Sequence, residues 1–110
     1  MGKSAFLSSC DIAKGVLANA GVSYENRAGV AGAPVTDWMD QYNLSDGNVG
    51  YRYSFGGSPW KREFAEQYRA QSPITYAANI QAPTLIMTNL EDFRVPPTQS
   101  FELYHALKDN

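Results

Sequence analysis

The sequence of 110 residues predicts an α/β fold in a single domain, residues 1–110, with about three parallel strands and covering helices. Short, continuous apolar segments alternate along the chain with segments of helical periodicity, and this order is typical of a parallel sheet. Hydrophobic residues make up 44% of the chain and charged residues 18%, which is a globular composition and not a disordered one.

Three short apolar segments predict the strands: residues 4–8, 28–31 and 84–87. The third, Thr-Leu-Ile-Met after Pro83, is the clearest, because a continuous apolar run is typical of a parallel strand that is buried on both faces. The second strand is followed by a Gly-Ala-Pro sequence at 32–34, whose small residues allow close approach of other backbone.

Segments with helical periodicity lie between the first and second predicted strands and after the third. Residues 11–20 carry apolar side chains on one face and are followed by Gly21, a natural helix stop. The final helix is expected at 98–108, after two prolines. Its expected apolar side is formed by Phe101, Leu103, Tyr104 and Leu107.

A helical excursion is predicted between the second and third strands. Thr36 or Asp37 can cap a short helix through Trp38 and Met39, whereas residues 43–57 are rich in glycine and polar residues and are expected to form a loop. Two Ser-Pro pairs, at 58–59 and 72–73, are typical of helix starts. The first should begin a helix whose apolar stripe is Trp60, Phe64 and Tyr68; the second should begin a short helix around 74–78.

Charge and cysteine content exclude several classes of protein. The net charge is −2 and no basic stripe is present, so we expect no nucleic-acid partner. No apolar run of about 20 residues is present, so we expect no membrane span, and the chain start does not resemble a secretory signal. The single cysteine, Cys10, excludes an intrachain disulfide. Together these features favour a cytoplasmic location.

Three segments together resemble the catalytic domain of prolyl-oligopeptidase-type serine peptidases, especially the dipeptidyl and acylaminoacyl peptidase branch. They are AGVAGAPVTDW at 28–38, SPITYAANI at 72–80 running into PTLIM at 83–87, and DFRVPPTQS at 92–100, continuing to 108. Their order and spacing also resemble those of the family, so 28–110 is the best-matching segment. The resemblance implies a partial α/β-hydrolase fold, from the C-terminal part of a truncated catalytic domain.

The resemblance places Asp92 at the position of the catalytic-triad acid, which follows a late strand of the sheet. In such a triad the carboxylate holds the histidine in one tautomer and stabilises its imidazolium form. The alternative is an ordinary loop carboxylate, or one paired with the neighbouring Arg94.

The sequence departs from the family at the other two triad positions. No Gly-x-Ser-x-Gly nucleophile sequence occurs; family spacing leads to Cys10, whose neighbours lack the glycines and include Asp11, so a buried, inert cysteine is expected. The only histidine, His105, lies in the final predicted helix and away from its apolar side, so it is not assigned a catalytic role. We therefore expect the chain to be inactive on its own.

A set of aspartates and a set of aromatic residues could each be read either as a functional site or as part of the structure. Asp37, Asp40 and Asp46 could suggest a cation site, but their spacing fits helix caps and solvated loops better. A dense aromatic region is expected to pack in a core or between domains, and the alternative is that it lines a substrate pocket; its members are Trp38, Tyr42, Tyr51, Tyr53, Phe55 and Trp60.

The resemblance implies hydrolysis of peptide or acyl-peptide bonds through a serine acyl-enzyme, without a metal or cofactor. The expected partners are a peptide substrate in the parent enzyme and either a second copy of this chain or the rest of the catalytic domain. The alternative function is that of a non-catalytic globular protein that reuses the scaffold for self-association or partner binding.

Overall fold

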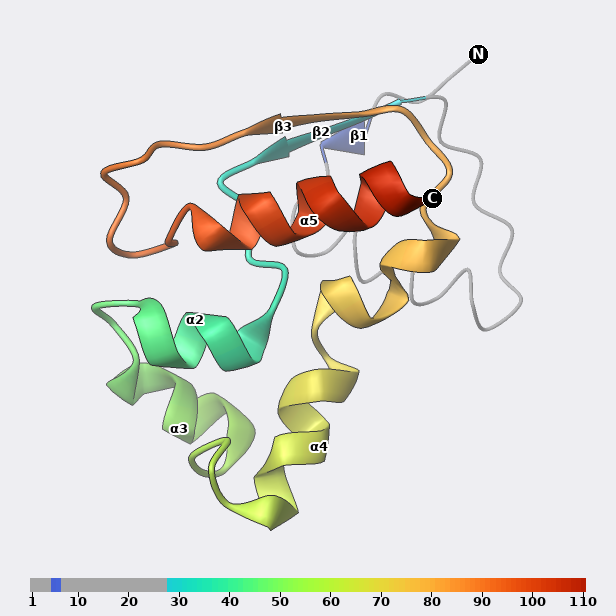
Figure 1. The fold of residues 1–110 in the computed structure, drawn as a ribbon. Helices are drawn as coiled ribbons and strands as arrows, with labels where there is room; N and C mark the ends of the chain where they lie inside the picture. Colours follow the sequence, from blue (N-terminus) through green and yellow to red (C-terminus); the bar gives the residue numbers. More distant parts are fainter. Residues whose placement is uncertain (1–4, 7–27) are drawn as a thin grey trace.

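A computed structural model describes Ala5–Phe6 and residues 28–110, and within these residues it shows a three-stranded parallel sheet (Figure 1). The strands lie in the order β1 (Ala5–Phe6), β2 (Gly29–Gly32) and β3 (Thr84–Met87). Val30 of β2 lies opposite Phe6 on one side and Leu85 on the other. The predicted parallel sheet is confirmed, whereas the predicted helix at 11–20 and Cys10 lie outside the described residues.

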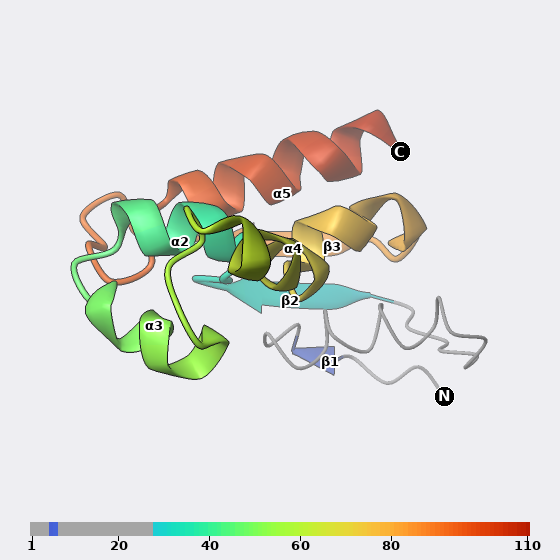
Figure 2. The same ribbon diagram turned by 90° about the horizontal axis from the view of Figure 1, so that it is seen from below.

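The helices form two groups around this sheet. α5 (Thr98–Asp109) runs along one face of the sheet, as Figures 1 and 2 both show. Between β2 and β3 the chain forms α2 (Trp38–Leu44), α3 (Val49–Phe55), α4 (Arg62–Ala70) and the 3₁₀ helix η1 (Pro73–Asn79). α2 and α3 lie toward the end of the sheet to which the β2 and β3 arrows point.

The contact between α5 and the sheet buries Leu103 completely against Ala31 of β2. Ile86 of β3 and Leu107 of α5 pack around this pair. The prediction that Phe101 and Tyr104 share this apolar side is wrong: they are 47% and 53% exposed. Two residues along a helix correspond to about 200° of rotation, so Phe101 faces away from the side on which Leu103 is buried.

β3 is a strand, as predicted, but the prediction that both of its faces are buried is wrong. Ile86 packs against the α5 layer, whereas Leu85 is 59% and Met87 48% exposed. Successive side chains of a strand point to opposite faces, so α5 covers only one of them. The described structure therefore presents apolar side chains on the other face of β3.

The helical excursion has an aromatic core of its own. Tyr42, Phe55 and Tyr68 are buried together, and the rings of Phe55 and Tyr68 are stacked with centroids 4.0 Å apart. Trp38 and Tyr51 pack at its border, with ring centroids 5.4 Å apart. The expected packing is confirmed for Trp38, Tyr42, Tyr51 and Phe55. The other two members of the predicted aromatic region lie outside this core, because Tyr53 is 86% and Trp60 70% exposed.

Two expectations about the excursion are wrong. Residues 43–57 are not all loop, because Val49–Phe55 forms α3. Burial of Phe55 against Tyr68 favours that helix more than its weak local propensity opposes it. The next helix begins at Arg62 and not at the Ser-Pro pair, so Trp60 lies outside it and is 70% exposed.

We predict that Gly57→Ala destabilises the packing between α3 and α4. A Cβ at Gly57 would lie 2.2 Å from Cε2 of Phe64, so the ring must shift, and we expect the free energy of unfolding to fall by about 1–3 kcal/mol. Gly50→Ala is the matched control, because a Cβ there meets nothing within 4 Å and alanine favours the helix by about 0.5–1 kcal/mol. Urea unfolding measures both; equal stability of the two variants would contradict the packing.

Candidate functional site

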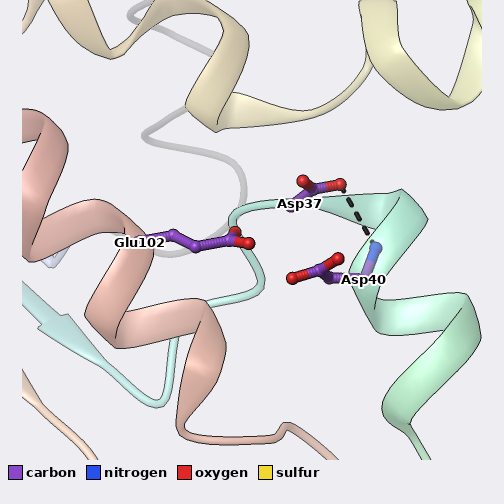
Figure 3. A group of neighbouring side chains, drawn as sticks. All are labelled: Asp37, Asp40 and Glu102. Carbon is purple, nitrogen blue, oxygen red and sulfur yellow. Dashed lines mark hydrogen bonds between the residues drawn. The ribbon is translucent and has the colours of Figure 1, made fainter.

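Three carboxylates meet where the start of α2 faces α5 (Figure 3). Glu102 extends from α5 toward Asp37 and Asp40, and one oxygen of each side chain lies within 4.8 Å of the others. Of the two cap candidates, Thr36 and Asp37, it is Asp37 that caps α2: its Oδ1 accepts hydrogen bonds from the backbone N–H groups of Met39 at 2.8 Å and Asp40 at 3.3 Å. The set Asp37, Asp40 and Asp46 considered from the sequence does not come together, because Asp46 pairs elsewhere.

A proton explains how these carboxylates coexist. Burial raises the pKa of Glu102 to about 8, and a hydrogen bond to Asp40 and the negative charges of Asp40 and Asp37 act in the same direction. At neutral pH Glu102 is therefore largely protonated and can donate to Asp40. In the described part of the chain these are the oxygens that could hold a hard cation, but the shared proton already reduces their repulsion.

Asp92 lies in the loop that follows β3, beyond the carboxyl end of the strand, where the sequence predicts it. A turn sets this position: the N–H of Asp92 donates to the carbonyl of Asn89 at 3.1 Å, and the side chain of Asn89 accepts from Glu91 N–H at 3.0 Å. In open α/β sheets, functional groups gather at the carboxyl ends of the strands.

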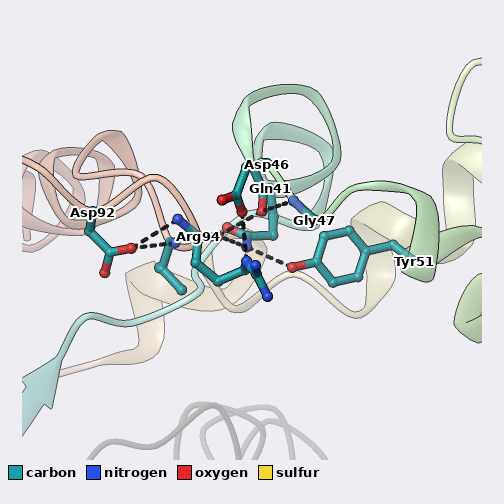
Figure 4. Close-up of polar contacts among 8 residues, drawn as sticks. Gln41, Asp46, Gly47, Tyr51, Asp92 and Arg94 are labelled. Atoms are coloured by element: carbon teal, nitrogen blue, oxygen red, sulfur yellow. Dashed lines mark hydrogen bonds and ion pairs between the residues drawn. The ribbon is translucent and has the colours of Figure 1, made fainter.

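The Asp92 carboxylate is held by its own loop (Figure 4). Oδ1 accepts hydrogen bonds from the N–H groups of Arg94 at 3.0 Å and Val95 at 2.9 Å. In the described residues every hydrogen bond to this carboxylate uses Oδ1, and the side chain is partly exposed. Oδ2 is therefore the oxygen that can accept a proton donor from outside the loop.

The C-terminal end of α2 holds the same loop from behind. The carbonyl oxygen of Arg94 accepts from Nε2 of Gln41 at 2.7 Å and from Oγ of Ser45 at 2.7 Å. The N–H of Asp46 donates to the carbonyl of Phe93 at 3.0 Å. Two consecutive carbonyls of the Asp92 loop are thus bound to one short segment, 41–46.

The alternative that Asp92 pairs with the Arg94 side chain is not observed. The Arg94 guanidinium instead contacts Asp46, with Nε 2.6 Å from Oδ1, and this hydrogen bond raises the pKa of Arg94. The two side chains are 69% and 53% exposed, so the ion pair adds little to stability. The guanidinium lies over Gly47, where a Cβ would be 3.2 Å from Nε.

A buried amide joins the start of α2 to α5. Oε1 of Gln99, a fully buried residue, accepts from the N–H groups of Thr36 and Asp37, each at 2.7 Å. Its Nε2 donates to the carbonyl of Asp37 at 2.9 Å, and the Thr36 hydroxyl donates to the Gln99 carbonyl at 2.7 Å.

Sequence reasoning missed Gln41, Ser45 and Gln99. For Gln41 and Gln99 the signal is a glutamine near apolar residues of a helix, because an uncharged amide at a buried position needs specific partners. Ser45 gives no such signal, because it lies in the segment expected to be a loop. His105, by contrast, is where the sequence predicts it: on α5, exposed, with its ring 5.5 Å from that of Tyr104.

A parallel sheet covered by α5, with a carboxylate loop after β3, defines this structure as part of an α/β-hydrolase fold. Solved structures agree with this class. The chain matches Pyrococcus horikoshii acylaminoacyl peptidase with a TM-score of 0.70 and 36% identity, over 79% of this chain and 14% of that one. An acylaminoacyl peptidase in complex with Z-Gly-Gly-Phe-chloromethyl ketone matches with a TM-score of 0.69 and 35% identity, over 86% and 16%.

The sequence comparisons give the family. The prolyl oligopeptidase family model matches residues 15–110. The uncharacterized peptidase YuxL of Bacillus subtilis is 32% identical over 101 residues, which are 86% of this chain and 14% of the relative's length. The chain belongs to the prolyl oligopeptidase family of serine peptidases. Within the residues that the structure describes, no helix has the length and apolar character needed to cross a membrane.

We predict that the Glu102 proton makes the fold less stable as the pH rises. The pKa of Glu102 is about 8 in the folded chain and near the ordinary 4.5 in the unfolded chain, so folding takes up a proton between these values. This contribution to the free energy of unfolding is complete below about pH 4.5 and is lost as the pH rises through about 8.

Glu102→Gln should remove this part of the pH dependence, because the amide stays neutral and can still donate to Asp40. Urea unfolding between pH 5 and pH 9 is the measurement, and Glu66→Gln on the exposed side of α4 is the matched control. A Glu102→Gln variant with the same pH dependence as the unsubstituted chain would contradict the shared proton.

Proposed function

We propose that this chain contributes the acid of a Ser-His-Asp triad, Asp92, to a peptidase that cleaves peptide or acyl-peptide bonds. The observation that carries the proposal is the hydrogen bonding of Asp92: one carboxylate oxygen is held by two backbone N–H groups, and the other remains available. A triad acid needs this combination, because it must be rigid and must also accept the imidazole N–H.

The mechanism assigns a limited role to this chain. Oδ2 of Asp92 accepts Nδ1–H of the triad histidine, fixes its tautomer and stabilises the imidazolium that forms when the nucleophilic serine loses its proton. The serine attacks the scissile carbonyl and forms an acyl-enzyme, which water then hydrolyses. The histidine and serine are supplied by other parts of the parent enzyme, since His105 is exposed on α5 and the 110 residues contain no Gly-x-Ser-x-Gly. The chemistry requires no metal or cofactor.

The relatives support a peptide substrate. One similar solved structure is an acylaminoacyl peptidase that carries a peptidyl chloromethyl ketone, and a second relative, the mouse acylamino-acid-releasing enzyme, is 46% identical over 43 residues. In such an enzyme this chain would form one part of the catalytic domain and would contact the rest of it.

A second function, non-catalytic association, has one observation in its favour. Leu85 and Met87 expose an apolar face of β3, and Leu90 and Phe93 are 73% exposed in the loop that follows. Apolar surface of this kind is typical of contact with another chain or with the rest of a domain. The sequence flanking this reading frame distinguishes the two functions: a Gly-x-Ser-x-Gly before it and a histidine after it favour the peptidase.

We predict that the 110-residue chain alone hydrolyses p-nitrophenyl esters no faster than background. Removing triad members leaves only the small residual rate that comes from binding and oxyanion stabilisation. The assay compares the chain with its Cys10→Ala variant. Turnover that depends on Cys10 would contradict the proposal and would indicate a cysteine nucleophile.

We predict that Asp92→Asn inactivates an enzyme built with this segment. Residues 28–110 replace the structurally matching segment of Pyrococcus horikoshii acylaminoacyl peptidase, and the chimera is assayed on acyl-peptide p-nitroanilides. Asp92→Asn should lower kcat by about 10⁴-fold with little change in KM, because the amide stabilises the wrong imidazole tautomer. Asp109→Asn, at the exposed end of α5, is the matched control. A folded, active chimera that tolerates Asp92→Asn would overturn the assignment.

A further inference from the structure

We infer that Gln41 and Ser45 are positioning residues that orient the Asp92 carboxylate through the backbone of its loop. The inference rests on the proposed function of Asp92, and it extends that function to two side chains of α2 and its C-cap that do not touch Asp92. Both donate to one acceptor, the Arg94 carbonyl, at 2.7 Å each.

The connection runs through a single peptide group. The carbonyl that Gln41 and Ser45 bind belongs to the amide between Arg94 and Val95, and the N–H of that amide donates to Oδ1 of Asp92 at 2.9 Å. Two donors on the oxygen polarise the amide and strengthen its N–H as a donor. They also fix the plane of the peptide, so the direction of the N–H toward Asp92 is set from α2 (Figure 4).

Gln41 is suited to this task because it has little freedom of its own. It is fully buried, and its Nε2 also donates to the hydroxyl oxygen of Tyr51 at 2.9 Å. The orientation of the amide follows from its partners: a carbonyl oxygen at the Nε2 position would face the Arg94 carbonyl without a donor between them. Gln41 therefore offers donors on the side of the loop.

Ser45 acts from a similarly fixed position. It is buried, its N–H donates to the Gln41 carbonyl at 3.1 Å, and its hydroxyl oxygen accepts from Gly47 N–H at 3.1 Å. This leaves the hydroxyl proton for Arg94. Its backbone is extended, with φ −80° and ψ 144°, a conformation in which threonine fits as well as serine.

The exposed ion pair between Arg94 and Asp46 explains the orientation of Asp92 less well than the buried donors do. Both of its side chains are mostly in water, where such pairs contribute little, whereas the donors from Gln41 and Ser45 are buried. The inference therefore assigns the orientation of Asp92 to the buried donors and not to the charges.

Hydrogen exchange on the 110-residue chain tests the connection, and mass spectrometry reads it even if the chain self-associates. Ser45→Ala should speed exchange of the Arg94 and Val95 amides by about tenfold, the effect of one lost buried hydrogen bond. Ser45→Thr, which keeps the hydroxyl, should restore slow exchange. Amides of α4 serve as the internal control and should not change, since a merely structural loss would speed them as well.

Loop exchange that is unchanged in Ser45→Ala, or raised equally by alanine and threonine, would overturn the inference. If Ser45→Ala speeds exchange throughout the chain, Ser45→Cys is measured in its place, because the thiol preserves volume but donates weakly. Faster amide exchange in Ser45→Cys that is confined to the Asp92 loop supports the positioning role, and unchanged exchange in that loop contradicts it.

The chimera separates this inference from the proposed function. If both are correct, Asp92→Asn abolishes turnover, Ser45→Ala lowers kcat by about 10- to 100-fold with KM unchanged, and Ser45→Thr restores it. If Asp92→Asn leaves turnover intact, the proposed function fails. If Asp92→Asn abolishes turnover but Ser45→Ala leaves kcat unchanged, only the positioning role fails.

Discussion

The buried amide of Gln99 is the interaction on which the arrangement of the other described elements depends. It binds the N–H groups of Thr36 and Asp37 and the carbonyl of Asp37, so the chain leaving β2 is fixed to the first turn of α5. Without it, two buried or partly buried N–H groups would lose their partners, at a cost of about 1–3 kcal/mol each. α5 packs on the sheet through Leu103 and Ala31. The Gln99 amide therefore fixes the position of the start of α2 relative to the sheet.

α2 connects the Gln99 amide to the loop that carries Asp92, because its two ends contact these two parts of the structure. Asp37 caps one end of the helix, next to the Gln99 amide, and Ser45 caps the other, next to the Arg94 carbonyl. The helix is short, Trp38–Leu44, so the two ends are only about two turns apart. Asp92 is consequently supported from both sides: its loop is joined to β3 at one end and α5 at the other, and α2 holds its centre.

The aromatic core of the excursion keeps α2 in place from the other side. Tyr42 lies in that core with Phe55 and Tyr68, and the Tyr68 hydroxyl donates to the Gly57 carbonyl at 2.8 Å. Burial raises the pKa of Tyr68, so its hydroxyl stays protonated and remains a donor. α2 therefore contributes Tyr42 to one core, and Gln41 to the polar contacts with the Asp92 loop. Adjacent residues of a helix point about 100° apart, which allows both contacts.

The sequence by itself determined the parallel strands, a helix cap at Thr36 or Asp37, the last helix and the position of Asp92 after β3, because each depends on local patterns of apolar, capping and breaking residues. Tertiary structure decided the rest. α3 exists because Phe55 finds Tyr68, and Phe101 is exposed because α5 packs through Leu103. The Arg94 carbonyl that Gln41 binds lies 53 residues away and the partners of Gln99 lie 62–63 residues away, and no local pattern specifies such pairs. A buried amide shows in the sequence only that partners are needed; the fold alone determines which backbone groups they are.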